Sequence, residues 1–303
     1  MPESSSPDLS YSTAIADSVD RRPSIATGKG LPRKPLGVSF WIAVGWIVVV
    51  VLLAIFANLL PLFNPMTVAA GPPMAGPSFV HLLGTDELGR DILARIIYGA
   101  RVSLVIGFGS IFMGTIVGGG LGLVAGYVKG VFDAFSNALA YVILAFPPLL
   151  LLLGIAAFSQ QTLLKLVLEF AFLSIAPLFR VTRAATMAVA SREFVQAAVA
   201  SGAGKVRVLL HEVLPGTLPS IISYALLGIA LVVVGEGSLA FLGLSIALPA
   251  PSWGNMIAEG RTFLSVDPWI SLFPSIAMFT LLLALNLAAD KLRDHFDVRE
   301  GQL

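Results

Sequence analysis

Residues 192–219 read REFVQAAVASGAGKVRVLLHEVLPGTLP, a polar stretch set between long apolar segments. Residues 202–204 (GAG) divide it into two short helical patterns, because glycine permits the sharp backbone turn between two helices. In the second pattern, apolar residues recur at helical spacing with charges between them, which is typical of an amphipathic helix lying along a membrane surface. We expect Pro215 and Pro219 to end that helix before the next apolar run. The stretch predicts a helix-glycine-helix elbow that projects from a membrane-embedded bundle.

Composition assigns the chain to the membrane proteins. Of its 303 residues, 56% are hydrophobic and only 12% are charged. The mean hydropathy of +0.89 lies well outside the balance of soluble domains. The net charge of +1 gives no overall field that would favour nucleic acid, and the absence of Cys excludes disulfides and thiolate metal sites. We therefore expect an all-α, polytopic protein whose main surroundings are the lipid bilayer.

Six apolar segments have about the length that a bilayer core requires. Residues 1–40 predict a disordered tail, and the first apolar segment predicts an uncleaved anchor rather than a signal peptide. Residues 61–100 predict a long loop outside the cytoplasm, with an amphipathic helix at residues 92–101 lying at the membrane interface. Residues 101–290 predict a five-helix core, and residues 291–303 a second tail. The six expected spans cover residues 41–60, 102–127, 134–157, 163–179, 221–244 and 271–289.

Two local features of these spans predict packing. Small residues at every fourth position let a neighbouring helix approach closely in lipid, so a glycine series in the second span predicts a packing face, with a pore-lining role as the alternative. The series comprises Gly114, Gly118, Gly122, Gly126 and Gly130. The third span contains Phe146-Pro147-Pro148, where the missing amide donors predict a kink.

Two carboxylates fall inside predicted spans, where an ionisable side chain is costly unless it faces protein, water or a partner. Glu169 should face the bundle interior or lie near the outer interface, and a structural hydrogen bond is favoured there over substrate contact. Glu236 lies between two glycines. It is a candidate for lining a translocation path, and an interhelical hydrogen bond is an equal alternative. Both residues remain candidates for such a path.

The distribution of positive charge orients the spans, because cytoplasmic segments carry an excess of Lys and Arg. Most of the 19 Lys and Arg residues fall on the side of the N-terminus when six spans are counted. This asymmetry places both termini and the elbow in the cytoplasm. The five basic residues on the other side are Arg90, Arg95, Arg101, Lys165 and Arg261.

Gln196-Ala197-Ala198, Gly202 and Leu214-Pro215 resemble the EAA loop of integral membrane subunits of binding-protein-dependent ABC importers, with Gln in place of the first Glu. In that family the loop, here residues 184–219, contains the coupling helix that docks on the ATP-binding subunit. The resemblance therefore implies a set of docking residues on the elbow. They are Glu193, Gln196, Ala197, Ala198, Ser201, Gly202, Ala203, Lys205, Arg207, Leu214 and Pro215.

Residues 81–104, HLLGTDELGRDILARIIYGARVSL, resemble a segment of the dipeptide/oligopeptide branch of these permeases. The carboxylates Asp86 and Glu87 also allow a metal or catalytic-dyad interpretation, but a polar turn with solvated or paired charges is favoured and no metal site is expected. Residues 251–254 (PSWG) match the same family, and Trp253 is expected to anchor at the interface.

The resemblance implies the type I ABC importer permease fold and the second membrane subunit of a dipeptide/oligopeptide importer in a bacterial inner membrane. It also implies three kinds of partner: a homologous permease forming a heterodimer, two ATP-binding subunits, and an extracytoplasmic solute-binding protein. ATP and Mg would be bound by the partner subunits. This agrees with the residues, because the best approach to a phosphate-binding loop, Gly204-Lys205, is followed by Val206 and lacks the upstream glycine.

The alternative function is an ion-coupled secondary transporter that uses Glu169 or Glu236 as a proton carrier. Such transporters are typically built from inverted repeats with interrupted spans, and no convincing repeat of that kind is seen in the sequence. A membrane enzyme is not supported either, because no nucleophile-base pair or His/Asp metal cluster is present in the sequence. We therefore favour the permease interpretation.

Overall fold

The computed structural model describes residues 36–157 and 161–300, the side chains of residues 297–300 excepted, and its regular elements are helices. The tail expected at residues 1–40 lies outside the described residues except for its last five positions. Within the described part, four helices are long and apolar enough to cross a membrane, and a bent pair of helices would make a fifth. The all-α membrane architecture is thus present, with four to five candidate spans where the sequence predicts six.

The first span is α2 (Gly37–Ile55), followed by the short helix η1 (Ala57–Leu59). It begins and ends earlier than the predicted residues 41–60. Its end is capped by Arg101, whose guanidinium donates to the backbone oxygens of Ala54 at 2.9 Å and Ile55 at 3.2 Å. A cation at this point satisfies carbonyls that have no partner within the helix and complements the helix dipole.

The expected interfacial helix at residues 92–101 is not a separate element. It forms the first turns of α3 (Ile92–Gly114), which continues through the π-helical turn η2 (Thr115–Gly119) into α4 (Gly120–Val128) as one helix of 37 residues. Asp91 caps its start, because the carboxylate accepts a hydrogen bond from the Ala94 backbone N–H at 2.7 Å. The helix is not interrupted after residue 101. Most side chains of residues 92–101 are also buried against the rest of the bundle, so the segment does not lie exposed at an interface.

The glycine series of this helix faces α7 (Leu163–Ala190). A Cβ added at Gly118 would lie 2.3 Å from the backbone oxygen of Ile175, and one added at Gly122 would lie 2.5 Å from that of Phe179. Gly114 and Gly126 contact α7 in the same way, whereas Gly130 has open space around it. The two backbones therefore approach as closely as small-residue packing in membranes allows.

The third segment is broken rather than kinked. Helices α5 (Gly130–Ala145) and α6 (Pro148–Ala156) meet at an angle of 81°. Phe146 between them has extended backbone angles, as expected for a residue that precedes proline. The polar pair of Arg183 on α7 with Asp133 on α5 holds the first of these helices against α7.

Helix α7 has 28 residues and is about 42 Å long at 1.5 Å per residue. The sequence predicts a span at residues 163–179, but α7 is not among the four helices that are apolar enough to span by composition. The reason is its charge, since it carries Lys165, Glu169, Arg180 and Arg183 within its length.

The elbow consists of α8 (Glu193–Ala200) and α9 (Lys205–Val208), which continues through the π-helical turn η3 (Leu209–Val213) into α10 (Leu214–Phe241). The expectation that Pro215 and Pro219 end a surface helix is wrong, because both lie within this continuous helix. Leu214 donates to the oxygen of Leu209, five residues earlier, and the resulting wide turn accommodates the proline that follows. The amphipathic segment is therefore the start of a membrane helix.

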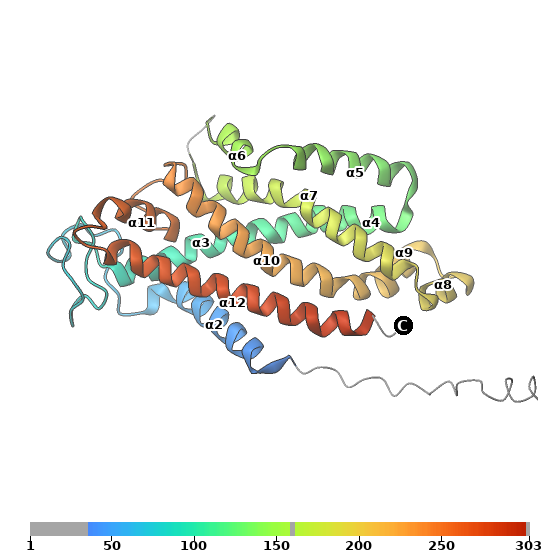
Figure 1. Ribbon diagram of the computed structural model, residues 1–303, viewed down its shortest axis with the longest axis horizontal. Coiled ribbons are helices and arrows are strands. Elements are labelled where there is room, and N and C mark those ends of the chain that lie inside the picture. The colour runs from blue at the N-terminus through green and yellow to red at the C-terminus, as the bar shows by residue number, and fades with distance from the viewer. Residues whose placement is uncertain (1–35, 158–160, 301–303) are drawn as a thin grey trace, which may run out of the picture.

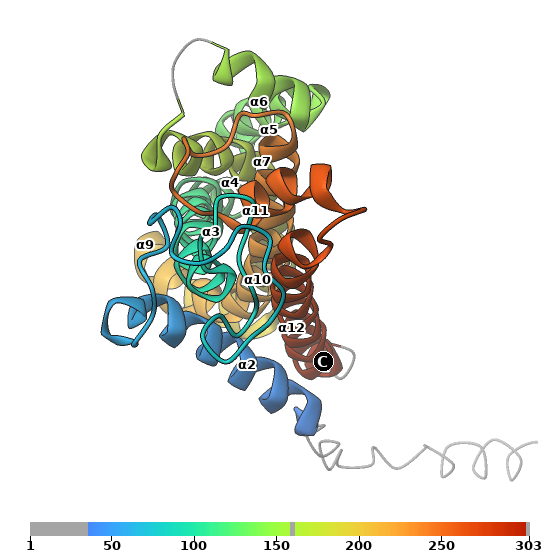
Figure 2. The same cartoon turned by 90° about the vertical axis from the view of Figure 1, so that its left-hand side faces the viewer.

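The chain ends with α11 (Trp253–Gly260), η4 (Arg261–Phe263) and α12 (Trp269–Glu300). Helix α10 packs against α3, α7 and α12, and α2 packs against α12. The elbow and the end of α12 lie at one end of the bundle, while α11 and the loop before α3 lie at the other; α2 begins part-way along the bundle and runs away from the elbow (Figure 1). Seen from that loop end, α5 and α6 form one edge of the bundle and α2 and α12 the opposite edge (Figure 2).

Candidate functional site

The elbow turns through a Schellman motif at the end of α8. Gly202 has φ +83°, and its N–H donates to the oxygen of Val199 at 3.0 Å. The N–H of Ala203 donates to the oxygen of Ala198 at 3.1 Å. Together these are the two hydrogen bonds that define the motif, and its left-handed residue is normally glycine. The glycine corner predicted from the sequence is therefore present, and the residue that requires glycine is Gly202.

One face of the elbow is buried against the bundle. Val195 of α8, Val208 of α9 and Val213 of η3 pack with Leu123 of α4 and Val189 of α7. Gly216 at the start of α10 also lies against Val189, since an added Cβ would be 2.9 Å from that side chain. The elbow is therefore seated on α4 and α7 through apolar contacts.

The other face of the elbow is exposed. Among the residues expected to dock a partner, Ala198, Ala203 and Leu214 are half-buried because they turn toward the bundle. The others are exposed, namely Glu193, Gln196, Ala197, Ser201, Gly202, Lys205, Arg207 and Pro215. The sequence analysis missed the apolar members of this face, Phe194, Val199 and Val206, which are also exposed. For Val206 the available signal was its position about half a turn from the buried Val208.

Glu236 lies inside the bundle and is only 1% exposed. Its Oε1 accepts hydrogen bonds from Ser245 at 2.5 Å and from Ser252, the N-cap of α11, at 2.7 Å. A Cβ on Gly254 would lie 2.8 Å from the other carboxylate oxygen. The bond to Ser252 connects Glu236 on α10 with the start of α11, which is the kind of contact that the sequence analysis gave as the alternative to lining a translocation path.

Glu169 is also buried and faces inward from α7. Its Oε1 lies 3.6 Å from the Lys165 Nζ and 3.5 Å from the Gln161 Nε2. Lys165 itself borders a cavity of about 520 Å³ beside the break between α5 and α6. A paired carboxylate explains how the helix tolerates this charge.

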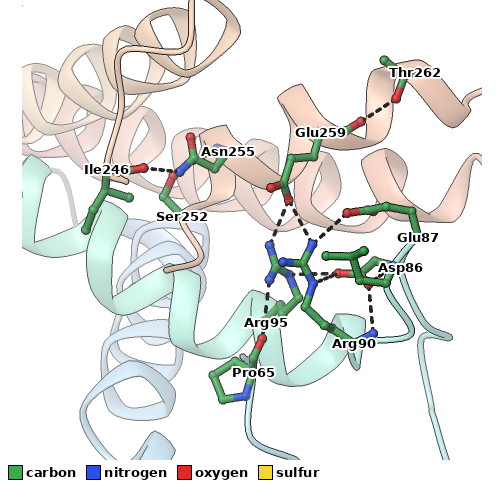
Figure 3. A network of polar contacts seen from close by, with 11 residues as sticks. Pro65, Asp86, Glu87, Arg90, Arg95, Ile246, Ser252, Asn255, Glu259 and Thr262 are labelled. Carbon is green, nitrogen blue, oxygen red and sulfur yellow. Dashed lines mark hydrogen bonds and ion pairs between the residues drawn. The ribbon is translucent and has the colours of Figure 1, made fainter. Parts of the chain in front are cut away.

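The end opposite the elbow contains a buried ionic network (Figure 3). Arg90 Nε lies 2.6 Å from Asp86 Oδ2, and Arg90 Nη2 lies 2.8 Å from Glu87 Oε1. Arg95 on α3 contacts Glu259 on α11 at 3.0 Å and Asp86 at 3.4 Å. The pairing expected for these charges is therefore present. Glu259 was not predicted as a member of this network, because it lies 164 residues beyond Arg95.

Two further contacts complete this end. His81 Nδ1 lies 2.8 Å from Asp91 Oδ2. Trp253 is buried rather than anchored at an interface, because its indole N–H donates to the Ile96 oxygen at 2.9 Å. These contacts hold the loop before α3 and the start of α11 against the bundle.

Burial raises the pKa of the Glu259 carboxyl, and the charges of Arg95 and Arg90 oppose that rise. The network contains three carboxylates and two guanidinium groups, and Glu87 Oε2 is the one oxygen of these carboxylates that is buried without a hydrogen-bond partner. Among the residues that the structure describes, no group of three or more His, Asp and Glu side chains could hold a metal ion. The ion pairs of this network connect the loop before α3, α3 and α11.

Comparisons with known proteins agree on one family. Residues 118–301 match the family described as "Binding-protein-dependent transport system inner membrane component". The chain is 36% identical over 247 residues to the dipeptide transport system permease protein DppC of Alkalihalophilus pseudofirmus, covering 82% of this chain and 81% of the relative. It is 35% identical to the DppC protein of Haemophilus influenzae, covering 89% of this chain and 97% of the relative.

A third relative is the glutathione transport system permease protein GsiD of Pectobacterium atrosepticum, which is 37% identical over 222 residues, covering 73% of this chain and 74% of the relative. The family match covers more than half of the chain, and the alignments with the relatives extend over most of it. The chain belongs to the family of binding-protein-dependent transport system inner membrane components, as a multi-pass permease subunit of an ABC importer whose ATP-binding subunits are separate polypeptides.

Proposed function

We propose that this chain is the second permease subunit of an importer of short peptides, such as dipeptides or glutathione, and that it pairs with a homologous permease. The names of the three relatives support this substrate class, because dipeptides and glutathione are both small peptides with a free amino group and free carboxylates. An extracytoplasmic binding protein would deliver the peptide, and two ATP-binding subunits would supply the energy.

The proposed subunit crosses the membrane six times. The four long apolar helices, the bent pair α5 and α6, and the charged helix α7 supply the six spans. The end of α12 and the elbow lie at the same end of the bundle, and α2 runs away from that end, which fits an even number of spans (Figure 1). With the excess of basic residues on that side, both termini and the elbow would face the cytoplasm.

The elbow is the feature that most strongly supports coupling of this chain to ATP-binding subunits. It joins the end of α7 to the start of α10 without a flexible linker, and α10 continues from it as one helix. A partner that grips the exposed face of α8 and α9 would therefore move two membrane helices together. ATP binding by the partner subunits would favour one of two bundle arrangements and so open the path alternately to each side.

Replacing Gly202 with Leu tests the elbow. We expect Gly202→Leu to abolish peptide uptake by the complete importer while membrane insertion persists, because a side chain is strained at φ +83° and would distort the docking corner. Gly204→Leu is the matched control, since Gly204 has a negative φ and open space around it, and should keep most of the uptake. Wild-type uptake by Gly202→Leu would contradict the coupling role.

Cysteine cross-linking tests the partner and the orientation, because the chain has no cysteine of its own. We expect Ser201→Cys to cross-link to an ATP-binding subunit and to resist impermeant maleimide added outside intact cells. Thr262→Cys, an exposed position at the opposite end, should react with that reagent and give no such cross-link. The reverse labelling pattern would overturn the proposed orientation.

A further inference from the structure

A cavity of about 400 Å³ lies between α7, α10 and α12 in the half of the bundle that bears the elbow. Its α7 wall consists of small and apolar residues, mainly alanines, whereas α10 contributes hydroxyl groups and α12 contributes charges. The volume lies within the range of pockets that bind small molecules. The polar residues that line it are Ser220, Ser223, Tyr224, Asp290 and Arg293.

The cavity is bordered by charges of both signs, on side chains that are themselves exposed. Asp290 and Arg293 are three residues apart on α12, so their side chains lie on the same face of the helix. A carboxylate accepts hydrogen bonds from an ammonium group, and a guanidinium donates to a carboxylate, often through two parallel bonds. The Tyr224 hydroxyl can donate or accept beside them. This set complements a small zwitterion rather than a simple cation or anion.

The cavity also lies next to the elbow, so that movement of the elbow would change the positions of its walls. Its α7 wall ends at Ala188, directly before Val189, which seats the elbow. Its α10 wall begins at Ser220, shortly after Gly216, which contacts Val189. Two walls thus lead straight into the elbow, whereas the α12 wall does not. A shift of the elbow would move the α7 and α10 walls relative to the charges on α12.

We propose that this cavity is a transient binding site for the transported peptide on the inner side of the membrane, with Asp290 receiving its free ammonium group and Arg293 its carboxylate. This inference rests on the proposed function and adds to it a site within the membrane subunit. Peptide held here would be released when the elbow moves two of the three walls. Ala184, Ala185 and Ala188, the lining residues of α7 nearest the elbow, have small side chains and so leave room for peptide side chains of different size.

The test measures binding of labelled dialanine to the whole importer in nanodiscs, with the binding protein omitted. We expect Asp290→Asn to weaken dialanine binding by about tenfold or more, because a charge-assisted hydrogen bond is lost. N-acetyl-dialanine lacks the ammonium group, so it should bind weakly to the wild-type complex and no more weakly to Asp290→Asn. Asp294→Asn, an exposed carboxylate on the same helix that does not line the cavity, is the control and should bind both peptides normally.

A second variant makes the result independent of charge. Ala188→Leu adds bulk at an exposed position bordering the cavity and should weaken binding of both peptides. The site is overturned if Asp290→Asn and Ala188→Leu bind dialanine like the wild type, or if Asp290→Asn weakens both peptides equally. It is also overturned if phosphatidylethanolamine in the nanodiscs displaces dialanine and phosphatidylcholine does not, because a lipid headgroup would then be the occupant.

The same complexes, reconstituted in sealed proteoliposomes so that import can be measured, separate this inference from the proposed function. If the wild-type complex assembles, hydrolyses ATP in response to the binding protein and imports dialanine, the proposed function stands whatever the variants do. If it assembles but imports no peptide, the proposed function fails first. If only the proposed binding site is wrong, the wild-type complex still imports dialanine, and dialanine binding is the same in Asp290→Asn and Ala188→Leu as in the wild type.

Discussion

The two ends of the bundle are held by different chemistry. At the elbow, three buried valines pack on Leu123 and Val189. At the opposite end, Arg90 and Arg95 are buried among three carboxylates from the loop before α3 and from α11. The end that we propose to receive the ATP-binding subunit is therefore joined by apolar contacts, and the end that would face the binding protein is joined by ion pairs.

This difference bears on which end can move. Apolar contacts have no preferred direction, so an element seated on them can shift by a small amount at little cost. Buried ion pairs require specific geometry, and separating them leaves charges without partners at a cost of several kcal/mol. We therefore expect the elbow to change its position during transport while α11 and the loop stay attached to α3.

The largest effect is expected from Arg95→Met at the ionic end. It leaves Glu259 and Asp86 buried with one guanidinium instead of two, and loss of one partner of a buried pair costs about 3 to 5 kcal/mol. The measurement is the melting temperature of the purified protein in detergent, which should fall markedly. Arg261→Met is the control, because Arg261 is exposed and only lies over the Phe241 ring at 5.5 Å.

A double variant sharpens this result. Combining Arg95→Met with Glu259→Gln removes one charge of each sign, so part of the lost stability should return if pairing is the cause. If the double variant melts lower than Arg95→Met alone, the pair acts through packing rather than charge, and the contrast between the two ends would lose its basis.

The sequence was sufficient where the cause of a structure is local. The corner at Gly202 follows from glycine's tolerance of positive φ, and a bend at Phe146-Pro147-Pro148 follows from proline geometry, although the structure breaks the segment there instead of kinking it. The packing face of Gly114, Gly118, Gly122 and Gly126 also followed from spacing alone. The corner and the bend depend on residues within one turn of one another, and the glycine face depends on a four-residue spacing within one continuous helix.

The sequence was insufficient where distant residues decide. The helix continues through Pro215 because a π-helical turn precedes that residue. Val208 and Val213, which flank or belong to this turn, pack on other helices. Glu259 could not be paired with Arg95 because the two are far apart in sequence and meet only when α11 folds onto α3. Trp253 was misplaced for the same reason, since the Ile96 oxygen that its indole binds lies on another helix.

The smaller effect is expected at the elbow, from Val208→Ala. Val208 is 0% exposed, and truncation of a buried valine should cost about 1 to 2 kcal/mol. Because Val208 belongs to the apolar cluster that seats the elbow, we expect faster hydrogen exchange in residues 193–213 with little change in melting temperature. Val206→Ala is the matched control, since Val206 is 70% exposed and its loss should leave exchange unchanged. If Val208→Ala lowered the melting temperature as much as Arg95→Met, the elbow would be attached as firmly as the ionic end. Its apolar contacts would then not explain how the elbow moves.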